Sequence, residues 1–162
     1  MDIVIREVKG EFGEWASVIR DSFATVAEEF GITRENAPTN PAFAEDGSLE
    51  KMKEKGIYMY GAYHDGRRVG FVAAEKAGDG CWYMERLCVL PQYRYMGIGR
   101  KLMDFVFETV RTQGGKKVSI GIINENQVLK NWYIGYGFAE TGTRKFSHLP
   151  FEVCFLEKEV QV

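Results

Sequence analysis

The chain has 162 residues, with 21 Lys and Arg against 23 Asp and Glu and a net charge of −2. This length fits one domain over residues 1–162, and such a chain buries about 70% of its unfolded surface without a metal or disulfide. Nucleic-acid-binding domains are usually strongly basic, so broad nucleic-acid binding is not expected. No apolar run reaches membrane length, so no membrane partner is expected either.

Three cysteines, Cys81, Cys88 and Cys154, cannot all pair, and each lies in a strand-like segment. We therefore expect reduced, buried thiols in a reducing compartment. With two histidines and no close cysteine pair, no metal site is predicted. Residues 1–6 contain no apolar signal-peptide core, so a cytoplasmic location is expected.

The first third of the chain predicts a strand over residues 3–8 and a long amphipathic helix over residues 12–30. A long loop follows over residues 32–46, and loops of this length often close over a site. Residues 48–55 predict a short charged helix.

The middle of the chain predicts a hairpin, with strands over residues 58–64 and 68–76 around Asp65-Gly66. A strand over residues 82–90 then leads into a helix over residues 97–113, where the apolar spacing changes to three and four.

The last third predicts a strand over residues 118–122, a helix ending near Gly135, and a closing hairpin over residues 138–146 and 151–157. Hairpins imply antiparallel pairing, whereas the crossover through the helix at 97–113 implies parallel pairing. The expected fold class is therefore α+β, layered α/β/α, with a mixed sheet flanked by about four helices.

The turn before the helix at 97–113 presents free backbone N–H groups at a helix N-terminus. Gly97 and Gly99 let a ligand approach the backbone, and the helix dipole favours an anion there. Arg94, Arg100 and Lys101 add positive charge. This turn is predicted to hold a pyrophosphate.

Two familiar phosphate-binding turns do not fit this pattern. Neither this turn nor residues 114–117 has the spacing of a P-loop, and Leu102 stands where a dinucleotide-binding turn has its third glycine. The pattern Arg94-x-x-Gly97-x-Gly99 after a strand is similar to the acyl-coenzyme A motif of GNAT N-acetyltransferases, Gln/Arg-x-x-Gly-x-Gly/Ala.

A second segment resembles the downstream motif of the same family. Asn126 is followed seven residues later by Tyr133, and Gly137-Phe138 then opens a strand. The resemblance extends over residues 69–157, although Tyr95-Met96 stand where small or basic residues are commoner.

The resemblance implies the GNAT acyl-CoA N-acyltransferase fold: a seven-stranded, mostly antiparallel sheet that splays near its middle around acetyl-CoA as co-substrate, with no metal. For Asn126 the alternative to a contact with the pantetheine arm is a helix cap, a role that Asn124 can fill instead. The residues that the resemblance assigns to cofactor binding are Leu87, Cys88, Val89, Arg94, Tyr95, Met96, Gly97, Ile98, Gly99, Arg100, Lys101 and Asn126.

Acetyl transfer needs a polarised thioester oxygen, a neutral amine and a proton for the leaving thiolate. A backbone N–H near Cys88 or Val89 can polarise the oxygen. The resemblance makes Tyr133 the acid, because a phenol can protonate a thiolate held beside it. The alternative for Tyr133 is core packing.

Glu85 is the candidate base, since burial raises a carboxyl pKa into a useful range. Strand alternation places it with Leu87 and Val89, and the alternative is an ion pair with an adjacent strand. Arg86 is expected to point to the opposite face and to be structural. His148, in an exposed turn, is a second candidate base.

The resemblance implies direct transfer of acetyl to a primary amine on a small molecule or a peptide, without an acyl-enzyme. The alternative is a non-catalytic acyl-CoA sensor, in which Tyr133 is dispensable. A third class, an interaction domain that contacts phosphates through the basic turn, would lose binding steeply with salt. Relatives are often dimers, so a homodimer is one expectation, and the acceptor is left open.

Overall fold

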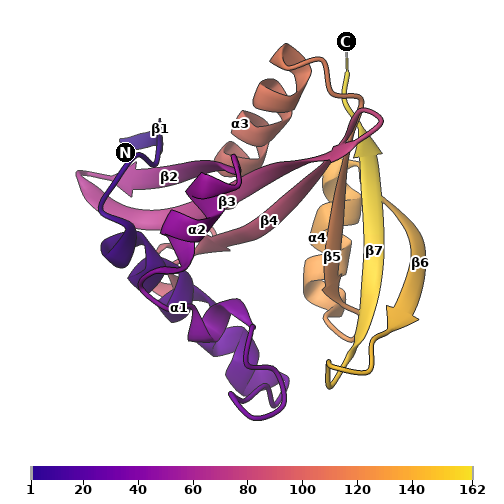
Figure 1. The fold of residues 1–162 in the computed structure, drawn as a ribbon. Coiled ribbons are helices and arrows are strands. Elements are labelled where there is room, and N and C mark those ends of the chain that lie inside the picture. The colour runs from indigo at the N-terminus through magenta and orange to yellow at the C-terminus, as the bar shows by residue number, and fades with distance from the viewer. Residues whose placement is uncertain (1, 162) are drawn as a thin grey trace.

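The computed structural model describes residues 2–161, and its elements follow the expected order (Figure 1). The strands are β1 (Ile3–Glu7), β2 (Tyr58–His64), β3 (Arg67–Gly78), β4 (Cys81–Val89), β5 (Lys117–Ile123), β6 (Ala139–Lys145) and β7 (Glu152–Glu159). The helices are α1 (Phe12–Glu29), α2 (Ser48–Glu54), α3 (Ile98–Thr112) and α4 (Gln127–Tyr136), with short 3₁₀ turns η1 (Pro41–Phe43) and η2 (Pro91–Tyr93).

The seven strands form one sheet in the order β1-β2-β3-β4-β5-β7-β6. Neighbouring strands pair antiparallel except β4 and β5, which are parallel because α3 carries the chain across the sheet between them. The expected mixed, mostly antiparallel sheet flanked by four α-helices is therefore confirmed.

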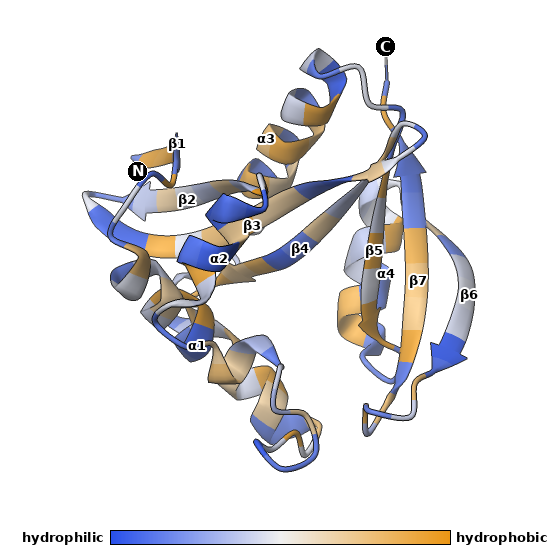
Figure 2. Cartoon of the chain, viewed as in Figure 1, coloured by the Kyte–Doolittle hydropathy of each residue, from blue (hydrophilic) through white to orange (hydrophobic). Residues whose placement is uncertain are grey.

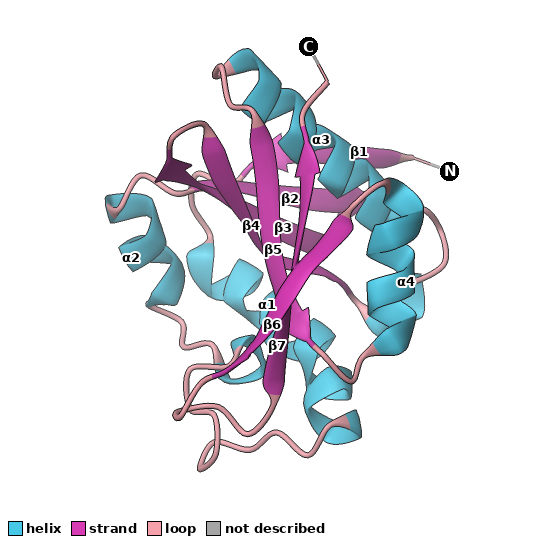
Figure 3. Ribbon diagram, turned by 90° about the vertical axis from the view of Figure 1, so that its right-hand side faces the viewer, coloured by secondary structure: helices cyan, strands magenta, loops and turns pink. Residues whose placement is uncertain are grey.

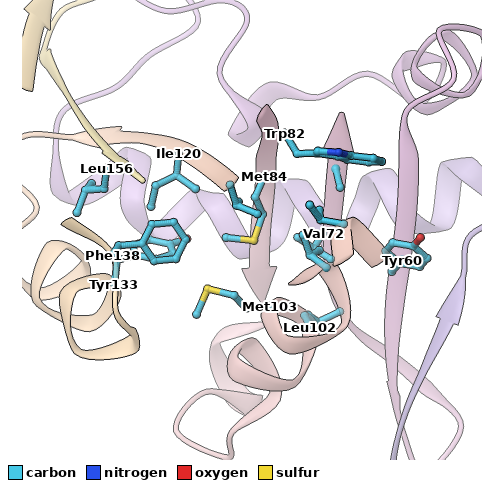
Figure 4. Close-up of a cluster of buried hydrophobic side chains, with 14 of the residues drawn as sticks. Tyr60, Val72, Trp82, Met84, Leu102, Met103, Ile120, Tyr133, Phe138 and Leu156 are labelled. Atoms are coloured by element: carbon cyan, nitrogen blue, oxygen red, sulfur yellow. The ribbon is translucent and has the colours of Figure 1, made fainter. Parts of the chain in front are cut away.

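Helices cover both faces of the sheet (Figure 3). The helices α1 and α2 pack on one face with a core that includes Trp15, Ile19 and Phe71. The helices α3 and α4 pack on the other, where the larger core reaches from Val72 on β3 to Tyr133 on α4 (Figure 4). Side chains from both halves of the sheet meet in this core, so it holds the two halves together.

The helix α3 shows how the sequence pattern sets the packing. Its apolar residues at four-residue steps, Ile98, Leu102, Val106 and Val110, are all at most 1% exposed. By contrast, every residue of β6 is exposed, and Figure 2 shows this edge strand as largely hydrophilic. Within residues 2–161, no helix is both long and apolar enough to cross a membrane.

Candidate active site

A cleft opens where the sheet splits between β4 and β5. These strands pair only at Cys81–Lys117, Trp82–Val118 and Tyr83–Ser119, and then diverge (Figure 1). The cleft between them has a volume of about 680 Å³ and is lined from both faces of the sheet. Past Tyr83, the backbone groups of β4 on this side have no partner in β5, so a bound molecule can pair with them.

A β-bulge at Arg86 changes which face each residue of β4 uses. Ala73 of β3 pairs with Glu85 and Phe71 pairs with Cys88, so two residues of β4 lie opposite Val72. Arg86 takes up the extra residue with a left-handed φ of 54°. The expected alternation is therefore wrong: Glu85 shares the α1 face with Cys88, not the face of Leu87 and Val89.

Glu85 is held in a partly buried pocket beside another carboxyl group. Burial raises its pKa from 4.5 to about 7, and a hydrogen bond and like charge from Glu75 add to the shift. The positive charges of Arg86 and Lys55 oppose it. A carboxyl group with a pKa near neutrality can take a proton from an ammonium group at physiological pH.

Tyr133 reaches the cleft from α4 and is 5% exposed. Its ring packs edge-on against Phe138 at 5.4 Å between centroids and against Trp132 at 5.0 Å (Figure 4 shows Tyr133 and Phe138). Burial, with a smaller contribution from nearby Cys88, raises the pKa of the phenol well above its ordinary value. The hydroxyl therefore stays protonated at neutral pH, as a proton donor requires.

Cys88 lies on the α1 face and is 8% exposed. Burial raises the pKa of its thiol to about 12, although a hydrogen bond to Ser22 and the charge of Arg94 partly offset the shift. A nucleophilic cysteine needs the thiolate form, so this environment is unsuited to an acyl-enzyme at Cys88.

The turn between β4 and α3 has the geometry of an anion-binding turn. Gly97 is the N-cap of α3 in a left-handed conformation, with φ of 81°, and supplies no capping side chain. A Cβ at Gly97 would meet no atom within 4 Å, so the turn is open to a ligand. The first N–H groups of α3 are thus free for acceptors from outside the chain.

The Arg94 side chain anchors this turn to the rest of the fold. Its guanidinium donates hydrogen bonds to Val89 O at 3.1 Å, to Ser22 O at 2.7 Å and to Thr25 Oγ1 at 3.1 Å. The last two partners belong to α1, so Arg94 ties the turn to the opposite helix layer. Three of its five N–H donors are used within the chain, and a phosphate contact through the remaining two stays a prediction.

Replacing Arg94 with Met is expected to destabilise the fold by about 2–3 kcal/mol, because buried carbonyls lose a charged donor. Urea unfolding of the variant measures this loss. The matched control is Arg67→Met, an exposed arginine at the β2–β3 turn, which we expect to change stability by less than about 0.5 kcal/mol. Equal unfolding midpoints for the two variants would contradict the anchoring role.

The other residues of the turn that are predicted to bind the cofactor differ in burial and in contacts. Ile98 is 1% exposed in the core, so only its backbone is available to a ligand. The Arg100 guanidinium lies 5.0 Å from the Tyr136 ring centroid, while Lys101 and Tyr95 are exposed and Met96 packs against the α3 core. Arg100 and Lys101 therefore add positive charge at the turn beside that of Arg94.

A model of the GNAT acetyltransferase family matches residues 21–138 of this chain. The chain belongs to the GNAT acetyltransferase family. An uncharacterised N-acetyltransferase of Mycobacterium tuberculosis is 34% identical over 85 residues, which is 52% of this chain and 54% of that protein. The chain thus spans about half the length of the curated relatives it matches.

Solved GNAT structures share the whole fold at low sequence identity. The ribosomal-protein-S18-alanine N-acetyltransferase of Escherichia coli aligns with a TM-score of 0.77 and 11% identity over 99% of this chain and 96% of that one. The PaiA N-acetyltransferase of Thermoplasma acidophilum, solved in complex with coenzyme A, aligns with a TM-score of 0.75 and 20% identity over 98% and 99% of the two chains.

Asn126, in the second GNAT-like segment, caps α4 and also faces the cleft. Asn126 Oδ1 accepts a hydrogen bond from Leu129 N at 3.2 Å, so Asn126 is the N-cap of α4. Asn124 does not cap this helix, because it bonds Lys130 and Glu152 instead. Since Asn126 also lines the cleft, the cap and a cofactor contact are compatible.

Two residues at the site were missed by the sequence argument. Arg86 was expected to be structural, yet it lines the cleft beside Glu85. Trp132 was not assigned to the site, but it is 40% exposed and its indole would lie 3.5 Å from a Cβ at Gly99. The second candidate base, His148, is exposed, and its ring packs at a tilt against Phe146 with 5.6 Å between centroids.

Proposed function

We propose that this protein is an acetyl-CoA-dependent N-acetyltransferase that moves acetyl directly to a primary amine in a ternary complex. The single observation that carries the proposal is the cleft between β4 and β5, which Glu85 and Tyr133 line from opposite faces of the sheet. One group is suited to accept a proton and the other to donate one. Membership of the GNAT family supports the reaction class.

The residues present fit acetyl-CoA as the donor. The open turn at Gly97 and the free N–H groups of α3 would hold the pyrophosphate, with Arg100 and Lys101 supplying charge. The unpaired edge of β4 over residues 87–89 would hold the pantetheine arm, together with Asn126. When bound, acetyl-CoA supplies the activated acetyl group.

The proposed proton transfers balance within the cleft. The acceptor ammonium loses one proton to Glu85, directly or through water, and the amine nitrogen then attacks the thioester carbon. The C–N bond forms as the C–S bond breaks, and Tyr133 gives its proton to the departing sulfur. The new amide nitrogen then releases its second proton to the Tyr133 phenolate, and Glu85 returns its proton to solvent. A backbone N–H at the end of β4 stabilises the developing oxyanion.

The alternative, an acyl-CoA sensor of the same fold, requires neither proton carrier. A carboxyl with a pKa near 7 beside an apolar cleft destabilises the folded protein at neutral pH. Such a cost is typical of groups that serve in catalysis, which favours the enzyme over the sensor.

The pH dependence of transfer tests the role of Glu85. The wild-type kcat/KM is expected to rise about tenfold per unit of pH below 7, because Glu85 must lose its proton before it can act as a base. Glu85→Gln should remove this limb and lower kcat by about 100-fold. Release of free coenzyme A thiol between pH 5.5 and 9 provides the measurement.

Stability provides the control for this variant. Because the pKa of Glu85 is higher in the folded state, its contribution to the free energy of unfolding of the wild type falls as pH rises from 4.5 through 7. The Gln variant should gain thermal stability relative to wild type at pH 8 more than at pH 5. Identical pH–rate profiles for both proteins would remove Glu85 from the mechanism.

A further inference from the structure

The half of the cleft on the α1 face is lined mainly by apolar side chains. Phe23 and Val26 come from α1, Pro41 from η1, and Phe151 and Phe155 from β7 and the segment before it. We call these five residues the apolar wall. Burial of an apolar group against such a wall removes hydrocarbon surface from water and favours binding.

One charged pair lies within this apolar half. Glu85 and Arg86 are the only acidic and the only basic residue among those lining the cleft in residues 2–161. Their Oε2 and Nη1 atoms lie 3.4 Å apart, and both side chains are about 70% buried, with 28% and 30% of their surfaces exposed. The long contact occupies one of the five N–H donors of the guanidinium.

The backbone at Arg86 is in the left-handed region, where a residue with a side chain is disfavoured. This conformation costs about 1–3 kcal/mol and recurs at sites of ligand contact. The guanidinium that this bulge carries lines the cleft beside Glu85. Its contact of 3.4 Å with Glu85 holds the guanidinium beside that carboxyl group.

We propose that the acceptor is a free α-amino acid with an apolar side chain. Its carboxylate binds the Arg86 guanidinium, its amino group lies toward Glu85, and its side chain lies on the apolar wall. This inference rests on the proposed N-acetyltransferase function and names the substrate class of the same cleft. Planar guanidinium groups bind carboxylates through paired hydrogen bonds, which gives the selection a physical basis.

The same lining disfavours polycationic acceptors. A polyamine or an aminoglycoside carries several positive charges, which need several carboxylates in the site. The cleft lining offers one, whose neighbour Glu75 is hydrogen-bonded to it outside the lining, and Arg86 beside it repels a second cation. An amino acid presents one charge of each sign, which matches the pair.

An acceptor panel tests this assignment by release of coenzyme A thiol. L-Phenylalanine retains all three groups, L-phenylalaninamide loses the carboxylate charge, phenethylamine loses the carboxylate entirely, and spermidine is polycationic. Wild type should show a kcat/KM for phenylalanine at least about tenfold above those for phenethylamine and spermidine, consistent with one charged contact. A ratio near one, or spermidine as the best acceptor, would overturn the proposal.

Arginine variants make the test specific. Arg86→Met should lower the ratio of kcat/KM for phenylalanine to that for phenethylamine by about tenfold or more, and Arg86→Lys should recover part of it. Comparison of this ratio between variant and wild type cancels the intrinsic reactivity of each amine. Arg111→Met, which removes an exposed arginine paired with Glu108 on α3, should leave the ratio unchanged. An unchanged ratio in Arg86→Met contradicts the proposal.

A calorimetric titration with acetyl-CoA distinguishes failure of the acceptor assignment from failure of the proposed function. If the protein binds acetyl-CoA but transfers no acetyl to amino acids, the acceptor assignment fails and the proposed function stands or falls on other amines. If acetyl-CoA itself does not bind, the proposed function fails and the assignment fails with it.

Discussion

Replacing Tyr133 with Phe is expected to lower kcat by about 100-fold to 1,000-fold, the usual contribution of a positioned general acid. The ring is held by Phe138 and Trp132, so phenylalanine keeps the packing while the proton donor is lost. Binding of acetyl-CoA should change little, because the variant removes one hydroxyl from the far end of the site. Steady-state kinetics with the best acceptor of the panel, together with calorimetry, measures both quantities.

The matched control is Tyr136→Phe on the same helix. The Tyr136 hydroxyl donates a hydrogen bond to Asp104 at 2.6 Å and is absent from the lining of the cleft between β4 and β5. Its loss should cost about 1 kcal/mol of stability and leave kcat nearly unchanged. If Tyr133→Phe turns over at the wild-type rate, another group protonates the thiolate.

Replacing Gly97 with Val is expected to weaken acetyl-CoA binding by about tenfold to a hundredfold, equivalent to about 1.4–2.8 kcal/mol. The side chain would occupy the open turn in front of the first N–H groups of α3 and keep a phosphate from the backbone. A φ of 81° adds strain for a β-branched residue. Calorimetric titration with acetyl-CoA measures the affinity.

Gly114 offers a closely matched control at the other end of α3. Its φ is 79°, and a Cβ there also meets nothing within 4 Å, so Gly114→Val carries similar strain without touching the cleft. Both variants should lose similar stability, and only Gly97→Val should lose affinity. Equal affinity in the two variants would contradict the placement of the pyrophosphate.

The sequence predicted the order of elements and the position of the turn because both depend on local patterns. The change from alternating to helical spacing after Leu90 located the start of α3, and Pro91 marked the end of β4. The Tyr133 prediction depended on family resemblance, since helical spacing alone equally indicated a core residue. Its position in both the core and the cleft shows that the two interpretations were compatible.

The local sequence pattern could not predict on which face of the sheet each residue of β4 lies. Alternation gives one face per residue only while the strand is regular, and the bulge at Arg86 shifts that count by one. No glycine or proline marks this bulge in the sequence, so Glu85 was assigned to the wrong face.

The hydrogen-bond partners of the Arg94 side chain could not be predicted either, for a different reason. Its partners Ser22 and Thr25 lie about 70 residues away in the chain, with separations of 72 and 69 residues. The motif fixed an arginine at this position, but only the packing of α1 beside the turn determines where its donors go.

The most direct test of the account is a calorimetric titration of the wild-type protein with acetyl-CoA, with NADH as the control. Both ligands carry a pyrophosphate and an adenosine, but only acetyl-CoA has the pantetheine arm and the thioester expected to lie along the edge of β4. We predict saturable one-to-one binding of acetyl-CoA with micromolar affinity and no measurable binding of NADH. Absence of acetyl-CoA binding, or equal binding of both, would contradict the assignment of this cleft.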